Sequence, residues 1–179
     1  SGNVTGNKVG GGTAGKGGAI YGEAGSTTTI TAGTYYDNQA KQGGAIYCLG
    51  TLDISGATFS QNKSNGAEGG AIYADATCVA TVENAIFDSN YGTTAGAIYV
   101  VAGGEVNCEN VAFTKNTSPG NGGAIHTKGT YTDHNSSYTE NSGKNGGAIA
   151  VLGGGSATLT GTDTTKALFS GNLATGASN

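Results

Sequence analysis

Few residues of this chain have side chains suited to catalysis, and these are widely spaced. The chain has 179 residues, with eight Lys, no Arg, two His and six Asp. Glycosidases need two carboxylates close together, and many polysaccharide lyases use an Arg or Lys beside acidic calcium ligands. The lack of Arg removes one of these routes. The six Asp occupy scattered positions in the sequence: Asp37, Asp53, Asp75, Asp88, Asp133 and Asp163.

The His and Cys residues form no metal-binding or catalytic motif. His126 and His134 have no Cys or carboxylate at metal-ligand spacing. Cys48, Cys78 and Cys108 fall at different places in the repeat described below, so we predict that all three are free thiols. We therefore predict no catalytic residue, no cofactor and no metal, and an enzyme of the lyase or glycosidase type is the alternative.

Charge and composition limit the classes of partner. A net charge of −4 gives no basic surface for nucleic acid, and no apolar run is long enough to span a membrane. The chain has no initiator Met and no signal peptide, so we expect a processed subunit or a segment of a longer protein.

Two motifs alternate along the chain and predict its fold. The peptide Gly-Gly-Ala-Ile-Tyr, with variations, returns at steps of 26, 26, 26, 27 and 24 residues. Between its copies, an aromatic residue stands three positions before an Asn. A fixed period of this length is typical of a repeat array in which each unit packs on its neighbours. The first motif begins at Gly17, Gly43, Gly69, Ala95, Gly122 and Gly146, and the second comprises Tyr35/Asn38, Phe59/Asn62, Phe87/Asn90, Phe113/Asn116, Tyr138/Asn141 and Phe169/Asn172.

Within each period, small and apolar residues recur every second position in three short stretches, as expected of strands with one buried face. Gly is frequent where two stretches meet, which favours tight corners. Three strands and three corners in ~26 residues predict one coil of a parallel β-helix. We expect about six coils, which form a single domain over residues 1–179 with open ends.

Equivalent residues of successive coils should stack in columns. We expect columns of Ile and of Phe or Tyr in the core, and an Asn ladder at one corner, because each side-chain amide both donates and accepts hydrogen bonds. Asp133 occupies a core column, so either the fifth coil shifts its register or this carboxyl group has a partner. The ladder comprises Asn38, Asn62, Asn90, Asn116, Asn141 and Asn172.

One column on the outside of the predicted rod is a candidate binding stripe. Each of its residues follows the Ile of the Gly-Gly-Ala-Ile motif and should point outward. These residues either stack as a structural ladder or bind a glycan, a receptor or another subunit. Of four N-glycosylation sequons, those at Asn3 and Asn135 are the candidates to carry sugar, because Asn62 and Asn116 belong to the ladder. The stripe comprises Tyr21, Tyr47, Tyr73, Tyr99 and His126.

The alternation of Gly-Gly-Ala-Ile with Phe-x-x-Asn from Gly17 to Asn172 resembles the repeats of the chlamydial polymorphic membrane proteins and related surface proteins. This resemblance implies a β-helical passenger exposed at the cell surface, often an autotransporter adhesin, and with the crossover rule it implies a right-handed helix.

The ends of the chain suggest a second function. Ser1-Gly2-Asn3 is similar to Ser170-Gly171-Asn172, and neither end has a capping helix. We therefore expect an extracellular, non-enzymatic protein. It is either an adhesin-like passenger that binds a host or cell-surface receptor or glycan, or a filament subunit that stacks end to end.

Overall fold

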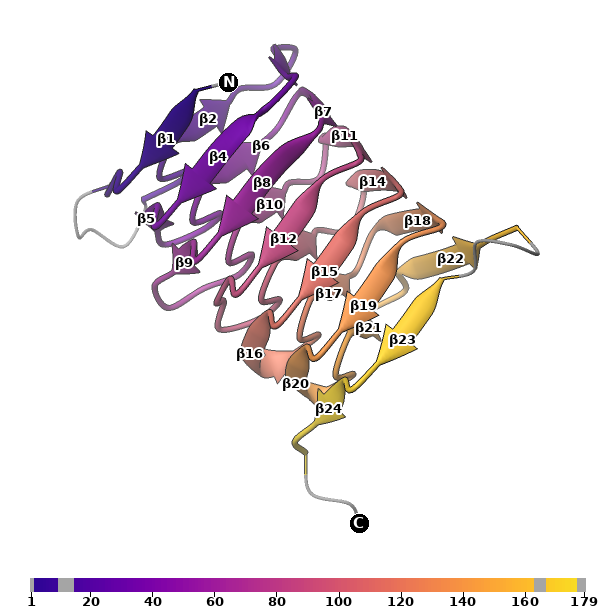
Figure 1. The fold of residues 1–179 in the computed structure, drawn as a ribbon. Coiled ribbons are helices and arrows are strands. Elements are labelled where there is room, and N and C mark those ends of the chain that lie inside the picture. Colours follow the sequence, from indigo (N-terminus) through magenta and orange to yellow (C-terminus); the bar gives the residue numbers. More distant parts are fainter. Residues whose placement is uncertain (1, 10–14, 163–166, 177–179) are drawn as a thin grey trace.

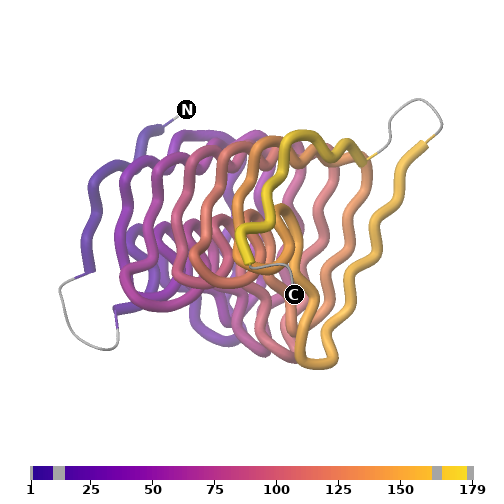
Figure 2. Tube along the Cα trace, turned by 90° about the horizontal axis from the view of Figure 1, so that it is seen from below, coloured from indigo at the N-terminus to yellow at the C-terminus, as the bar shows by residue number. Residues whose placement is uncertain are grey.

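Short strands recur in the same order in every coil of the chain (Figure 1). The computed structural model describes residues 2–9, 15–162 and 167–176, and all regular elements in these ranges are β-strands. The strands pair in parallel with the equivalent strands of the coils before and after. Successive coils lie side by side from the N-terminal to the C-terminal end of a rod (Figure 2). The predicted parallel β-helix is confirmed.

Three main sheets form the walls of the rod, and we name them by their residues. The isoleucine sheet contains the Gly-Gly-Ala-Ile motif, and its strands are β2 (Ile20–Gly22), β6 (Ile46–Cys48), β10 (Ile72–Ala74), β13 (Ile98–Val100), β17 (Ile125–Thr127) and β21 (Ile149–Val151). The long-strand sheet consists of β3 (Thr27–Ile30), β7 (Thr51–Ser55), β11 (Val79–Glu83), β14 (Glu105–Glu109), β18 (Thr130–His134) and β22 (Ser156–Thr160). The aromatic sheet consists of β1 (Asn3–Thr5), β4 (Gly33–Tyr36), β8 (Ala57–Ser60), β12 (Ile86–Asp88), β15 (Ala112–Thr114), β19 (Ser137–Thr139) and β23 (Leu168–Ser170).

Two small sheets lie after the Asn corner. One contains β16 (Thr117–Asn121), β20 (Ser142–Asn145) and β24 (Leu173–Ala174), and the other contains β5 (Gln39–Ala40) and β9 (Lys63–Ser64). Counted between equivalent strands, the rod has about five turns, whereas the sequence predicts about six coils. The two counts agree, because the six strands of the isoleucine sheet are separated by five steps.

The core consists of stacked columns, as the residue periods predict. Ile46, Ile72, Ile98 and Ile125 are fully buried and lie opposite one another in the isoleucine sheet. The aromatic sheet contributes what we call the inner aromatic column, whose rings stack at centroid distances of 4.6 to 5.1 Å. Its members are Tyr35, Phe59, Phe87, Phe113, Tyr138 and Phe169.

The two Gly of the Gly-Gly-Ala-Ile motif have different roles. The first takes the left-handed conformation in every copy, including Ala95 at φ 61°. The second lies against the next coil, and a Cβ on Gly44 would lie 2.1 Å from the carbonyl oxygen of Gly70. Gly50, at the corner before the long-strand sheet, has no positive φ. Gly50 is needed instead because a Cβ would lie 2.2 Å from the Ser26 carbonyl oxygen.

Candidate binding surfaces

The rings of the predicted binding stripe stack along the isoleucine sheet. The centroids are 5.5 Å apart for Tyr21 and Tyr47, 4.8 Å for Tyr47 and Tyr73, and 5.3 Å for Tyr73 and Tyr99. His126 continues the column, edge-on to Tyr99 at 5.1 Å. Successive residues of a strand point to opposite faces, so these rings lie on the face opposite the buried Ile. We call this column the outer tyrosine stripe.

Most of the outer tyrosine stripe is not available to a ligand, which corrects the expectation of an exposed face. Tyr47, Tyr73, Tyr99 and His126 are buried, with at most 9% of each residue exposed, and only Tyr21 at the N-terminal end is open at 46%. The stripe is thus the centre of a second, smaller hydrophobic cluster, which lies on the outer face of the isoleucine sheet.

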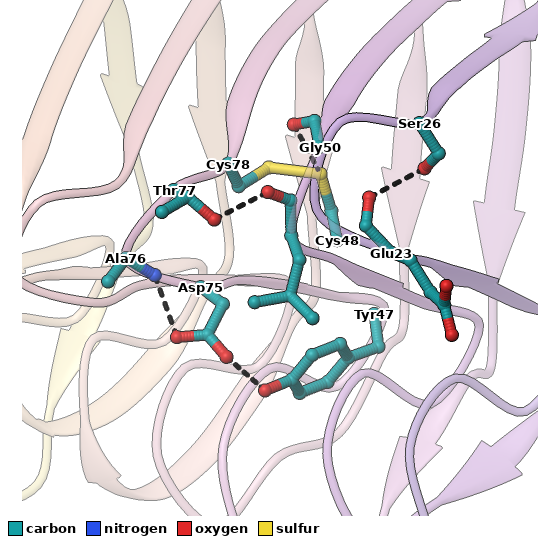
Figure 3. Close-up of a disulfide and its surroundings, with 10 residues drawn as sticks. Glu23, Ser26, Tyr47, Cys48, Gly50, Asp75, Ala76, Thr77 and Cys78 are labelled. Carbon is teal, nitrogen blue, oxygen red and sulfur yellow. Dashed lines mark hydrogen bonds between the residues drawn. A yellow bond between two sulfur atoms is a disulfide. The ribbon is translucent and has the colours of Figure 1, made fainter.

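Side chains from neighbouring corners cover the stripe. Leu49 and Val101 pack against it. The Tyr47 hydroxyl donates a hydrogen bond to the Asp75 carboxylate (Figure 3), and the Lys16 ammonium group lies 4.2 Å from the centre of the Tyr47 ring. Burial, followed by the hydrogen bond to Asp75, raises the pKa of Tyr47 well above its ordinary value, so this hydroxyl stays neutral.

A disulfide joins two neighbouring coils close to the stripe (Figure 3). It links Cys48 at the end of β6 to Cys78 just before β11, with 5.5 Å between the Cα atoms. The prediction of three free thiols is therefore wrong for this pair. The two Cys lie in different columns, one on each side of a corner, and comparison within single columns could not reveal a diagonal pair. Cys108 is a free, buried thiol.

The Asn ladder runs along the whole described rod with one constant pattern. The Asn62 side-chain amide donates to the Asn90 Oδ1 at 2.9 Å and to the Tyr35 carbonyl oxygen, and the Asn62 backbone N–H donates to the same Asn90 oxygen. Asn7 adds a rung that the sequence analysis missed, since it donates to Asn38 Oδ1 in the same way. Val4 replaces the aromatic residue of the motif there, so an apolar-x-x-Asn pattern would have found it.

The ladder has a direction, and its two ends differ. From Asn38 to Asn141, each rung donates its backbone N–H and one amide hydrogen to the next ladder Asn toward the C-terminal end. Its other amide hydrogen goes to a carbonyl oxygen of the preceding coil, and its Oδ1 accepts from the preceding ladder Asn. Asn172 therefore has a backbone N–H and one amide hydrogen without an acceptor among residues 2–9, 15–162 and 167–176, and Asn7 has an Oδ1 without a donor there.

Asp133 has partners inside the core, and the fifth coil keeps its register, so the second of the two sequence-based alternatives holds. Asp133 pairs opposite Cys108 and Leu159 in the long-strand sheet. Its carboxylate accepts hydrogen bonds from the Ser136 hydroxyl and, at 2.8 Å, from the Tyr138 hydroxyl. Burial raises the pKa of this carboxyl group above its ordinary value, although the two hydroxyl donors act in the opposite direction.

The hydroxyl groups extend this cluster. The Tyr131 and Tyr138 oxygen atoms are 2.6 Å apart, and Tyr131 is the donor because the Tyr138 hydrogen is directed to Asp133. Burial also raises the pKa of the Cys108 thiol far above its ordinary value. This cluster is closed to solvent, so it stabilises the core and offers no surface to a substrate.

The last described coil exposes the core of the rod. Phe169, the final ring of the inner aromatic column, is 49% exposed, and Leu159 and Leu173 are also exposed. A hollow of about 580 Å³ lies at this end, and Ile149, Leu159, Phe169 and Asn172 help to line it. This hollow is an apolar surface that a partner could reach.

The other predicted sites lie apart from these surfaces. Asn3 is exposed on β1, and Asn135 is half-buried at a corner with φ 62°, whereas Asn62 and Asn116 are buried in the ladder. Asp163 lies outside the described residues. Within the described ranges, no three His, Cys, Asp or Glu side chains are grouped as metal ligands. No helix that could cross a membrane occurs in the same ranges.

Comparison with known families agrees with the repeat pattern. The family model of the Chlamydia polymorphic membrane protein repeat matches residues 36–49, 56–75 and 110–128. Three segments of the chain are thus similar to this repeat. Each matched segment contains an Asn-ladder residue of a coil, and the three segments reach into three strands of the isoleucine sheet. Searches of the curated proteins and of the solved structures returned no match.

Proposed function

We propose that this protein is an extracellular, non-enzymatic β-helical rod of a cell surface, and that it associates end to end with a second copy of itself. The similarity of three segments to the Chlamydia polymorphic membrane protein repeat supports a surface location. The Cys48–Cys78 disulfide supports the same location, because structural disulfides persist mainly in oxidising compartments.

The apolar C-terminal end carries the proposal of association. A β-helix that ends in exposed core residues and unpaired strand edges offers a template for further strands, and Phe169 offers an open ring face to another aromatic or aliphatic residue. The N-terminal end offers half-buried Val4 and Ile20 at the same core columns.

The direction of the Asn ladder selects the orientation of the second copy. Asn172 offers donors and Asn7 offers an acceptor, so the C-terminal end of one copy fits the N-terminal end of the next. Such a head-to-tail contact does not close on itself and yields a filament. Two C-terminal ends would place donor against donor, and two N-terminal ends would place acceptor against acceptor.

The strand counts also predict the strength of the contact. The aromatic sheet has seven strands and the other two walls have six each. When β1 of a second copy continues the aromatic sheet after β23, one strand position remains unfilled beyond β21 and another beyond β22. We therefore expect weak association that requires high protein concentration.

Electron microscopy and analytical ultracentrifugation over a concentration series test this proposal. Phe169→Glu places a charge on the apolar end and should abolish the thin fibres, or the concentration-dependent rise in mass, of the unmodified protein. Leu168→Glu is the matched control, since Leu168 is the preceding residue, is 59% exposed and belongs to the side wall of the aromatic sheet. Uniform monomeric rods of the unmodified protein at the highest concentration would exclude the filament.

An adhesin-like passenger is the second candidate, and the surface-protein repeats favour it. The outer tyrosine stripe could bind a receptor or glycan only through Tyr21, its exposed member. Tyr21→Ser should then reduce binding to cells or glycan arrays, with Tyr36→Ser, which changes an exposed tyrosine of the aromatic sheet, as the control. A reducing-sugar assay with polysaccharides such as pectate tests the enzyme alternative, which we expect to fail.

A further inference from the structure

His126 differs from every other member of the outer tyrosine stripe. It is 3% exposed, and neither ring nitrogen has a hydrogen-bond partner among the described residues. A buried polar group without a partner is rare in native proteins. In the three coils before it, the same position holds a tyrosine ring that stacks face to face with its neighbour.

Among the described residues, the groups around His126 offer no hydrogen-bond acceptor to a charged imidazole. From β13, the neighbouring side chain is Tyr99, whose ring meets the imidazole edge-on, and from β21 it is Ala150. The charged group that acts on the imidazole is Lys128, a second cation. The Lys128 ammonium group lies 6.0 Å from the centre of the Tyr99 ring, so it faces the same part of the stripe.

We propose that His126 is a proton-operated latch, and that protonation of its ring opens the outer tyrosine stripe between β13 and β21 and exposes Tyr99. A charged imidazole in this place would be desolvated, would have no acceptor and would lie beside Lys128. Opening lets water reach the ring and relieves all three effects. The latch lies within the rod and is independent of end-to-end association.

The pKa of the His126 ring sets the pH range in which the latch opens. Burial, followed by the charge of Lys128, lowers the pKa of His126 from 6.5 to about 4. The closed state therefore binds the proton less well than the open state, where the pKa returns to its ordinary value. The closed state keeps its full stability above pH 6.5 and loses it as the pH falls toward 4.

The inner side of the same coils responds in the opposite direction. The buried carboxyl group of Asp133 has a raised pKa, so acid relieves the cost of its charge. Acid therefore weakens the outer stripe of the fifth coil while the core beneath it is stabilised. The opening is expected to be local to the outer face.

The first part of the test is an NMR titration of the histidine rings, which measures the pKa of His126. It is practicable because the chain contains only His126 and His134. The second part is amide hydrogen exchange of β13 and β17, expressed as protection factors to remove the intrinsic effect of pH. In the unmodified protein, protection should fall by about tenfold per pH unit between pH 6.5 and 4. His126→Tyr restores the residue type of the stripe and should abolish this fall.

Two further variants make the result unambiguous. Lys128→Gln should raise the pKa of His126 and reduce the fall in protection, since one of the two causes of the shift is removed. His134→Gln changes the half-exposed His of the long-strand sheet and should leave the fall unchanged. Constant protection of β13 and β17 from pH 7 to 4, or an equal fall in His126→Tyr, would overturn the latch.

Discussion

The inner aromatic column and the outer tyrosine stripe run in parallel along the rod with the same coil spacing, yet they are enclosed by different means. Three sheets surround the inner column, so Phe59, Phe87 and Phe113 are fully buried by backbone-supported walls. The outer stripe lies outside these walls, and side chains such as Leu49 and Val101 pack against it. Stacking at coil spacing thus does not distinguish core from surface. The covering residues do.

The largest expected effect is the loss of stability when one ring of each column in the third coil is replaced by Ala. Phe87→Ala should lower the free energy of unfolding by about 3–5 kcal/mol, because rigid sheets cannot collapse around the cavity. Tyr73→Ala should cost roughly 2 kcal/mol, because the covering side chains can move into the space. Urea unfolding monitored by circular dichroism measures both. Equal losses would mean that the two columns are equally rigid.

The disulfide strengthens the corner beside the outer stripe, and its removal should have the next largest effect. Replacing Cys48 and Cys78 together by Ala should destabilise the protein by about 3 kcal/mol, since the unfolded chain loses a constraint across the intervening residues. Cys108→Ala leaves the disulfide in place and is the control. In denaturant without reductant, thiol titration of the unmodified protein should find one free thiol, and a count of three would contradict the pairing.

A smaller effect separates a titratable group of the core from a titratable group of the outer tyrosine stripe. The buried Asp133 carboxyl group has a raised pKa, so it contributes stability that is present below its unfolded pKa and is lost as pH rises through the folded value. Its contribution changes by at most about 1.4 kcal/mol per pH unit. Because His126 has the opposite dependence, the comparison is made between His126→Tyr and His126→Tyr/Asp133→Asn. The double variant should lose less stability from pH 4 to 7, and parallel curves would contradict this.

The smallest effect concerns a single hydrogen bond of the outer stripe. Tyr47→Phe removes the hydroxyl that donates to Asp75 but keeps the stacked ring, and we expect a loss of about 1 kcal/mol. Tyr21→Phe, at the exposed end of the same stripe, should be neutral. Thermal unfolding of the two variants checks this, and a neutral Tyr47→Phe would show that the Asp75 contact adds little.

The sequence allows prediction of the features that repeat and hides those that occur once. The Ile positions, the aromatic positions and the ladder Asn recur at fixed spacing, so their columns follow from period alone. The Cys48–Cys78 pair occurs once and crosses a corner diagonally, so no column reveals it. Asp133 is recognisable as a misfit, but its partner Tyr138 comes from the next strand and Ser136 from the corner before it, so both emerge only when the corner is known.

The exposure of the outer stripe is the main error of prediction, and its cause is physical. Alternation within a strand shows that Tyr47 and Ile46 point to opposite faces, but not what covers each face. The covering groups come from corners, where residue spacing is irregular: Leu49 and Val101 follow the strands of the isoleucine sheet, and Lys16 precedes the first of them. The special role of His126 escaped prediction for the same reason. Only the structure shows that this residue is buried and that its ring nitrogens lack hydrogen-bond partners.

The second Gly of each Gly-Gly-Ala-Ile motif has a consequence for the evolution of rods of this kind. The carbonyl oxygen of one coil occupies the place where a Cβ of the preceding coil would lie, from Gly18 to Gly123. Every coil therefore makes the same close backbone contact with the coil before it and with the coil after it. When a whole coil is duplicated or deleted, the coils that become neighbours still have matching contact surfaces. When half a coil is deleted, they do not. Genes for such rods can change their length by recombination between repeats, one whole coil at a time.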